Sequence, residues 1–130
     1  MTDEIRLPIS GRPVYALVSE MAFATKIAKA VNSFHLKVRN FDRAEALISN
    51  AAQEGPCLII LDWDSREAES YKVLKEVKER PGLQSTAVVG FVAAGKRDVG
   101  REAETAGCLR VYFKTDFLKN LNDLIMRFAK

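Results

Sequence analysis

Five short runs rich in apolar residues recur along the chain, and those at 57–61 and 87–92 contain no polar alternation. Unbroken apolar runs of this length are typical of strands buried on both faces, as in the middle of a parallel sheet. We therefore expect strands at 13–18, 36–39, 57–61, 87–92 and 110–113. Each run is followed by a segment with apolar residues at helical spacing, and strict alternation of strand and helix indicates a parallel sheet with helices on both faces.

The predicted helices differ in how clearly their ends are marked. Asp42 is placed to cap a helix that Gly55 ends, and Thr115 or Asp116 is placed to cap the last helix. The segment 67–80 has the clearest helical pattern, with oppositely charged side chains four residues apart. The segment 95–107 has the weakest, because Gly100 lies inside it and few large apolar side chains are offered to a core.

Length and composition indicate a single domain. The chain has 130 residues, and we expect a polar tail at 1–12 followed by one domain at 13–130. The net charge of +3, spread over interleaved acidic and basic residues, gives no indication of nucleic-acid binding. No apolar run approaches the roughly 20 residues that a membrane span needs. Cys57 and Cys108 lie in apolar surroundings without metal-ligand spacing, so we expect buried free thiols in a cytoplasmic protein.

Charged residues at the ends of three predicted strands form the candidate site. Asp62 and Asp64 follow the run at 57–61. Glu20 follows the first strand and Lys114 follows the fifth. In a doubly wound sheet with strand order 2-1-3-4-5, Glu20 and Asp62 face each other at the switch point, and Lys114 reaches in from strand five. Carboxylates placed in this way suit a hard cation such as Mg²⁺, and the ammonium group would stabilise an anion on the carboxylate.

Simpler interpretations of the same residues stay open. Asp62 could be a strand-end carboxylate paired with Lys114, and Glu20 could be a solvated loop residue. Asp64 could contribute only its backbone carbonyl group. Trp63, which lies between the two aspartates, is expected at the partly exposed rim of the site.

Short motifs in a consistent order carry a family resemblance. Leu58-Ile59-Ile60-Leu61 runs into Asp62, Ala106-Gly107 precedes the fifth strand, and the fifth strand ends in Phe113-Lys114-Thr115-Asp116-Phe117. Over residues 13–129 the sequence resembles the bacterial response-regulator receiver domains of the CheY-like superfamily. The resemblance implies a flavodoxin-like (βα)5 fold, with a doubly wound parallel sheet of order 2-1-3-4-5 and helices on both faces.

The resemblance also implies roles for the residues at the strand ends. Asp62 corresponds to the phospho-acceptor, and Lys114 to the lysine that stabilises the phosphoryl group. Glu20, Asp62 and Asp64 correspond to the ligands of a Mg²⁺ ion, which we expect to bind weakly because Ser19 stands where a second acidic residue would precede Glu20.

Other departures from the family pattern concern the response to phosphorylation. Val92 stands where a hydroxyl residue is expected, and Val111 stands where the switch aromatic is expected. Asp116 replaces the proline after the lysine, and Arg66-Glu67 replaces a proline-glycine pair. We therefore expect a degenerate receiver, which keeps the fold, the acceptor and the lysine but lacks the residues that read out phosphorylation.

The function that the resemblance implies is signalling in a bacterial two-component (phosphorelay) system, not enzymatic catalysis. The expected mechanism is docking to a histidine kinase or a downstream signalling protein through the fourth helix, fifth strand and fifth helix, and a homodimer is also compatible with it. We expect no contact of this domain with nucleic acid or membrane. The alternative is a flavodoxin-type small-ligand-binding or enzymatic α/β domain. Residues 19–22, however, lack the glycines or hydroxyls of a phosphate-binding loop, and neither a P-loop nor a GxGxxG motif is present.

Overall fold

Strands and helices alternate through the whole of the described chain. The computed structural model describes residues 12–128, so almost all of the expected tail at 1–12 lies outside the described residues. The elements are β1 (Val14–Leu17), α1 (Met21–Asn32), β2 (Val38–Asn40), α2 (Ala44–Glu54), β3 (Leu58–Asp62), α3 (Glu67–Glu79), β4 (Ala87–Val92), a 3-10 turn (Ala94–Lys96), α4 (Arg97–Thr105), β5 (Arg110–Phe113) and α5 (Lys114–Phe128).

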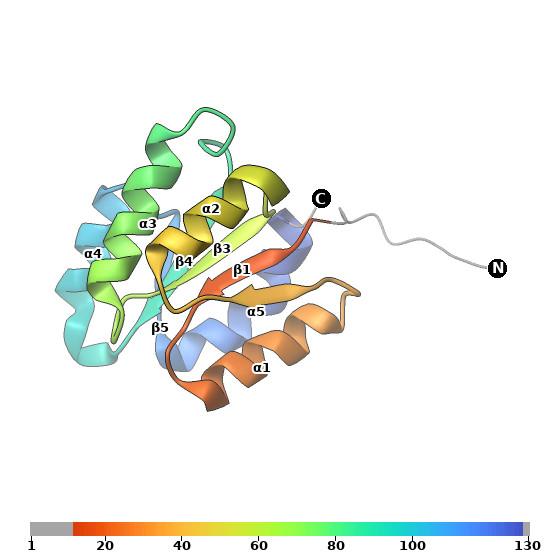
Figure 1. Cartoon of the computed structure of the whole chain (residues 1–130). Helices are drawn as coiled ribbons and strands as arrows, with labels where there is room; N and C mark the ends of the chain where they lie inside the picture. The colour runs from red at the N-terminus through yellow and green to blue at the C-terminus, as the bar shows by residue number, and fades with distance from the viewer. Residues whose placement is uncertain (1–11, 129–130) are drawn as a thin grey trace.

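The five strands form one parallel sheet in the order β2-β1-β3-β4-β5 (Figure 1). This arrangement confirms the predicted flavodoxin-like, doubly wound architecture. β3 lies in the centre, and all five of its residues are buried. Its register places Leu61 beside Leu17 of β1, and Asp62 beside Phe91 of β4. The unbroken apolar run at 57–61 therefore marks the middle of the sheet, as expected for a strand covered on both faces.

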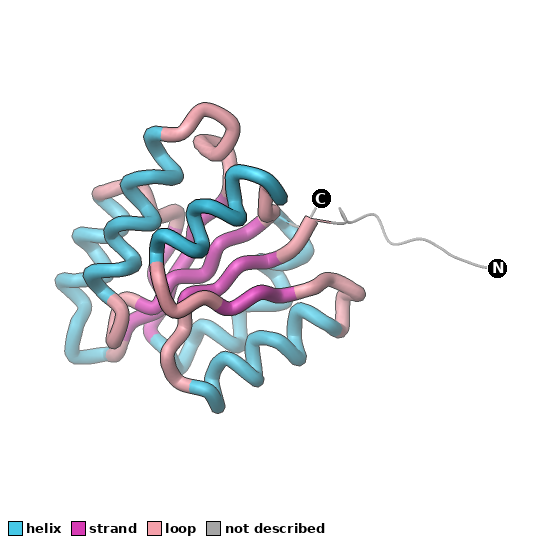
Figure 2. The backbone as a smooth tube through the Cα atoms, in the orientation of Figure 1, coloured by secondary structure: helices cyan, strands magenta, loops and turns pink. Residues whose placement is uncertain are grey.

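Helices cover both faces of the sheet (Figures 1 and 2). α1 and α5 pack on one face, where Ile27 and Leu121 lie in the same buried cluster as Ile60 of β3. α2, α3 and α4 pack on the other face, in a cluster that contains Leu61. Successive residues of a strand point to opposite faces, so β3 supplies side chains to both clusters. None of the helices within residues 12–128 has both the length and the apolar character needed to cross a membrane.

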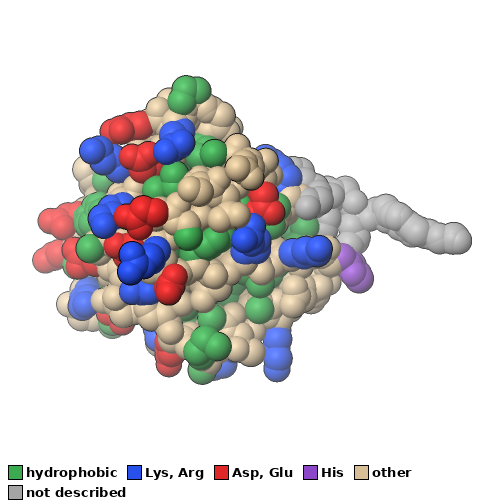
Figure 3. All heavy atoms as spheres, viewed as in Figure 1, with side chains coloured by type: hydrophobic (Ala, Val, Ile, Leu, Met, Phe, Trp, Pro, Cys, Tyr) green, Lys and Arg blue, Asp and Glu red, His purple; other side chains and the backbone are tan. Residues whose placement is uncertain are grey.

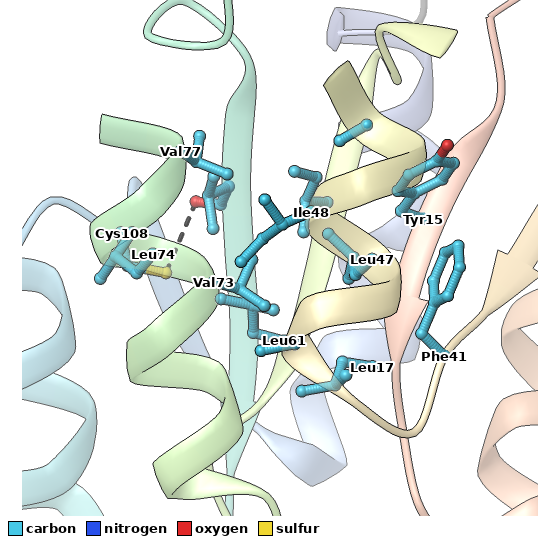
Figure 4. Close-up of a cluster of buried hydrophobic side chains, with 14 of the residues drawn as sticks. Tyr15, Leu17, Phe41, Leu47, Ile48, Leu61, Val73, Leu74, Val77 and Cys108 are labelled. Atoms are coloured by element: carbon cyan, nitrogen blue, oxygen red, sulfur yellow. Dashed lines mark hydrogen bonds between the residues drawn. The ribbon is translucent and has the colours of Figure 1, made fainter. Parts of the chain in front are cut away.

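Figure 4 shows the cluster between the sheet and helices α2 and α3. Leu47 and Ile48 of α2 face Val73 of α3 across Leu61 of the central strand. At the edge of this cluster the Cys108 thiol donates to the Val88 carbonyl oxygen, with 3.5 Å between sulfur and oxygen. Cys57 is also buried, and neither cysteine forms a disulfide within the described residues, as predicted. Burial raises the pKa of the Cys108 thiol to about 12, so this sulfur stays protonated and unreactive at neutral pH.

The helix caps differ from the sequence-based expectations. α2 begins after Arg43 rather than Asp42, and no side chain from its own N-terminus caps it. Instead, Glu69 of α3 accepts a hydrogen bond from the Ala44 backbone N–H at 2.7 Å, which lowers the pKa of the Glu69 carboxyl. α5 begins at Lys114, directly after β5, so the predicted caps Thr115 and Asp116 lie inside its first turn. The predicted end of α2 is confirmed, because Gly55 has a φ of 60° at its C-cap.

Gly100 allows close packing of α4 on the sheet, although glycine has a low helix propensity. It is buried in α4, and a Cβ atom at this position would lie 3.2 Å from Val111 Cγ1 and 3.4 Å from Val92 Cγ1. The missing side chain lets the backbone of α4 lie close to β4 and β5. This glycine therefore weakens the helix but brings it close to the sheet.

Candidate functional site

The carboxyl ends of β1, β3 and β5 lie along one edge of the sheet, because all the strands are parallel. Glu20 comes between β1 and α1, Asp62 is the last residue of β3, and Lys114 is the first residue of α5. The predicted site residues therefore come from neighbouring parts of one edge, and their side chains engage different partners there.

The Asp62 carboxylate is buried and held by its own loop. Only 2% of the residue is exposed, and one carboxylate oxygen accepts hydrogen bonds from the Asp64 and Ser65 backbone N–H groups, each at 2.9 Å. The other oxygen accepts a hydrogen bond from the Ser65 hydroxyl at 2.8 Å. An aspartate that binds backbone N–H groups two and three residues ahead forms an Asx-type turn. Asp62 thus organises the connection from β3 to α3.

The backbone of Asp62 is fixed as firmly as its side chain. Ser70, a completely buried residue of α3, donates its hydroxyl to the Asp62 carbonyl oxygen at 2.9 Å. On the next residue, the Trp63 N–H donates to the Phe91 carbonyl oxygen of β4 at 2.9 Å. Buried polar groups that are satisfied in this way favour a single arrangement of the loop.

Lys114 is paired with Glu20 and not with Asp62. Its ammonium group forms an ion pair with the Glu20 carboxylate and lies 4.9 Å from the centre of the Phe23 ring. Phe23 in turn contacts Phe91 and Phe117, with ring centres 4.6 and 6.2 Å away. The space beneath the Glu20–Lys114 pair is therefore aromatic and apolar. The simple pairing of Asp62 with Lys114 considered from the sequence is not the arrangement found.

Asp64 faces a different cation. Lys96, in the turn before α4, lies 3.5 Å from the Asp64 carboxylate and donates to its backbone carbonyl oxygen at 2.8 Å. The Asp64 side chain is 31% exposed, so this is a half-solvated surface pair. The contact links the loop after β3 to the start of α4.

The predicted metal ligands Glu20, Asp62 and Asp64 thus have three separate sets of partners. Among residues 12–128, no three histidine, cysteine or acidic side chains converge closely enough to hold a metal ion. Ser19 supplies no carboxylate next to Glu20. As they lie, these residues do not form a preassembled oxygen cage for a divalent cation, which would require several oxygen ligands around one point.

Trp63 is completely buried, so the prediction of a partly exposed rim residue is wrong. Its indole ring lies against β4 where Gly90 has no side chain, since a Cβ atom there would be 2.4 Å from Trp63 Cδ1. On its other side the ring makes an edge contact with Tyr71 of α3, 4.7 Å between centres. The indole N–H has no acceptor in hydrogen-bond geometry within the described residues. The ring enters the core under α3 instead of bordering the site.

The two positions at which the receiver pattern expects a switch carry valines in contact with α4. Val92 is 2% exposed and Val111 is partly buried, and both approach Gly100. Neither side chain can form a hydrogen bond with a phosphoryl group. The end of β4 and the middle of β5 are therefore apolar packing positions.

Three contacts at this edge were not foreseen from the sequence. They are the Ser65 and Ser70 hydroxyl groups on Asp62, and the Lys96 contact with Asp64. The spacing of Asp62 and Ser65 is a signal that was available, because an aspartate followed by a hydroxyl residue three positions later is typical of a side-chain-capped turn. The other two contacts join residues eight and 32 positions apart and leave no local pattern.

Comparisons by sequence identify no relatives. No protein-family model matches the chain, and no curated protein matches it.

Comparisons of structure, in contrast, find many similar chains. A response regulator from Hahella chejuensis superposes with a TM-score of 0.79 at 19% identity, covering 92% of this chain and 96% of its own. The receiver domain of the sensor histidine kinase PA1611 from Pseudomonas aeruginosa PAO1, which has a magnesium ion coordinated in its active-site cleft, gives 0.76 at 16% identity, with coverages of 92% and 98%. The phosphorylated cyanobacterial phytochrome response regulator RcpA gives 0.73 at 16% identity, with coverages of 92% and 94%. This chain therefore has the fold of response-regulator receiver domains.

Proposed function

We propose that this chain is a receiver-type signalling domain of a two-component system, which docks to a protein partner and whose phosphorylation switch is degenerate. The observation that carries the proposal is the state of Asp62: on a receiver fold, the carboxylate at the end of β3 is held by three hydrogen bonds within its own loop. On this proposal the domain is not an enzyme, and its activity lies in the surface that it presents.

Phosphorylation of Asp62 would require this loop to open. A carboxylate oxygen would attack the phosphorus atom of a phosphohistidine or of a small acyl phosphate, forming an acyl phosphate as the bond from phosphorus to the donor's nitrogen or oxygen breaks. The attacking oxygen would first have to lose its bond to the Ser65 hydroxyl or to the two backbone N–H groups. Lys114 could stabilise the phosphoryl group only after leaving Glu20. Each rearrangement adds to the barrier, so we propose that Asp62 accepts phosphate slowly.

A Mg²⁺ ion at Glu20, Asp62 and Asp64 would be bound weakly. The receiver domain of PA1611 holds magnesium in its active-site cleft. Here the three carboxylates are engaged by Lys114, by the Asp62 loop and by Lys96. A cation would have to displace these partners before it gained oxygen ligands. This displacement has a free-energy cost that is absent when a site is preformed.

The proposed docking surface consists of α4, β5 and α5. β5 is an edge strand, and Val111, Tyr112 and Phe113 are only partly buried. Phosphorylation would have little means to alter this surface, because Val92 and Val111 offer no hydroxyl or ring to move. We therefore propose that a protein partner, or a second copy of the chain, recognises the unmodified form.

The proposal can be tested by intact mass spectrometry after incubation with acetyl phosphate and Mg²⁺. We expect a slow, incomplete gain of one phosphoryl group that Asp62→Asn abolishes. Asp123→Asn, at an exposed position of α5 away from the site, should leave this gain unchanged. Amide spectra in the presence of beryllofluoride should show changes confined to 62–65, with none along α4. Rapid stoichiometric phosphorylation, together with large shifts along α4, would demonstrate a working switch and refute the proposal.

A further inference from the structure

A groove of about 310 Å³ lies between α4 and the edge strand β5. α4 lines it with Arg97, Arg101 and Glu104, and β5 lines it with Arg110, Val111 and Phe113. Gly100 is also part of its wall, and its lack of a side chain sets how closely the helix approaches the strand. The groove thus combines an apolar floor with a charged rim.

Two of the three arginines of the groove lie against aromatic rings, and none of the three is neutralised by a carboxylate within the described residues. The Arg97 guanidinium lies 5.6 Å from the centre of the Phe113 ring, and the Arg110 guanidinium lies 4.8 Å from the centre of the Tyr112 ring. Within residues 12–128, none of Arg97, Arg101 and Arg110 forms an ion pair with a carboxylate. A guanidinium stacked on an aromatic ring keeps its hydrogen-bond donors free for a carboxylate.

The one acidic residue of the groove already has a partner. Glu104 accepts a hydrogen bond from the Val111 backbone N–H at 2.8 Å, which ties the C-terminal half of α4 to β5. Its carboxylate is therefore committed to the backbone. Three positive groups and one engaged negative group leave the groove with an excess of positive charge.

Some exposed arginines elsewhere on the molecule are paired with carboxylates. Arg39 pairs with Glu54 at 2.7 Å, and Arg80 pairs with Glu76 at 3.1 Å. In Figure 3, basic and acidic side chains lie interleaved over the α2 and α3 side of the molecule. In the groove, three arginines without an ion pair inside residues 12–128 surround an apolar floor, and this combination fits an anionic partner with apolar side chains.

We propose that the groove between α4 and β5 binds an acidic, partly apolar segment of a partner protein. Arg97 and Arg101 are four residues apart and so lie side by side on one face of α4. Each guanidinium can bind a carboxylate through a bidentate pair of hydrogen bonds. Arg110 binds a further carboxylate from the strand side. An apolar side chain of the segment packs on Val111 and Phe113. This inference rests on the proposed docking function and assigns the chemistry of the partner.

Two other occupants fit the groove less well. A second copy docked symmetrically by the same surface would bring two sets of unpaired arginines together, and like charges at an interface are costly. A nucleic acid would approach α4 across Asp98 and Glu102 as well, which are exposed on the same helix. An acidic protein segment avoids both conflicts, because its carboxylates can be spaced to meet the arginines alone.

The inference can be tested with the full chain and a short fluorescein-labelled peptide carrying glutamates and leucines one helical turn apart. The control peptide has glutamine in place of each glutamate. We expect the acidic peptide to bind in a salt-dependent manner by fluorescence anisotropy and to shift the amide signals of Arg97, Val111 and Phe113. The double variant Arg97→Glu/Arg101→Glu should weaken binding at least tenfold, which corresponds to about 1.4 kcal/mol.

The matched control is Lys26→Glu/Lys29→Glu, which makes the same change in charge on α1, on the opposite face of the sheet, and should leave the affinity unchanged. Equal binding of the glutamine peptide, or equal losses in both double variants, would overturn the inference. So would a dimer in sedimentation that Arg97→Glu/Arg101→Glu dissociates, or a DNA duplex that binds more tightly than the peptide. Failure of the proposed function would instead appear as rapid phosphorylation of Asp62. That experiment contains no peptide, so the two failures are distinguishable.

Discussion

Replacing Asp62 provides the sharpest test of its role, because two views of this residue predict opposite changes in the free energy of unfolding. In a site that crowds carboxylates for a metal ion, removing one relieves repulsion and stabilises the fold. In this structure the carboxylate accepts three hydrogen bonds from its own loop while it is 2% exposed. Removing it therefore leaves backbone N–H groups without an acceptor, and the fold should lose stability.

The magnitude follows from the hydrogen bonds. A hydrogen bond to a charged acceptor contributes about 1.5–3 kcal/mol, and water can replace part of the loss at the half-exposed Asp64 and the exposed Ser65. We expect Asp62→Ala to lower the free energy of unfolding by about 2–4 kcal/mol. Asp62→Asn keeps one oxygen for both N–H groups and should cost about 1 kcal/mol, as should Ser65→Ala, which removes a single bond.

The measurement is urea unfolding followed by the emission of Trp63, the only tryptophan and a fully buried one. Asp64→Ala is the matched control, since it removes a carboxylate that forms only a surface pair with Lys96 and should change stability by less than about 1 kcal/mol. A gain in stability for Asp62→Ala would show that repulsion dominates at this site and would refute the reasoning.

Two further predictions concern the neighbouring strand and the metal. Gly90→Ala would place a methyl group 2.4 Å from Trp63 Cδ1 and 2.6 Å from the Leu61 carbonyl oxygen, so we expect it to lower the free energy of unfolding by about 1–3 kcal/mol or more. The control is Gly95→Ala, which would meet no atom within 4 Å and should leave the free energy of unfolding nearly unchanged. Equal effects of the two substitutions would contradict the packing of Trp63 against Gly90. Magnesium should shift the amide signals of 62–65 only at concentrations on the order of millimolar, and saturation at micromolar levels that Asp62→Asn abolishes would show a preformed site.

The order and type of the elements could be predicted from the sequence because they depend on local patterns. The unbroken apolar run before Asp62 and the helical spacing in α3 were sufficient to place the centre of the sheet and its covering helix. The start of α2 could not be placed, since the group that caps it belongs to Glu69, 25 residues away. No property of residues 42–44 indicates such a partner.

At the site, the sequence predicted which residues lie at the edge of the sheet, but not which partners their side chains contact. Glu20, Asp62 and Lys114 do lie at one edge of the sheet, as their positions after strands predicted. Which carboxylate faces the lysine depends on the packing of Phe23 and on the Ser65 turn, and the sequence specifies neither directly. Trp63 was misplaced for a similar reason, because its burial requires the gap that Gly90 leaves on the adjacent strand.

The direct passage from β5 into α5 has a mechanical consequence. Lys114 is the first residue of a 15-residue helix, with no loop between it and the strand, and its ammonium group is paired with Glu20 just before α1. A helix of this length is a stiff rod of about 22 Å. A tilt of about 5° at Lys114 would carry the far end of the rod through about 2 Å, a displacement of the size by which helices shift at regulated interfaces. With valines at the two switch positions, this helix is a direct mechanical connection from the end of β5 to the far end of α5.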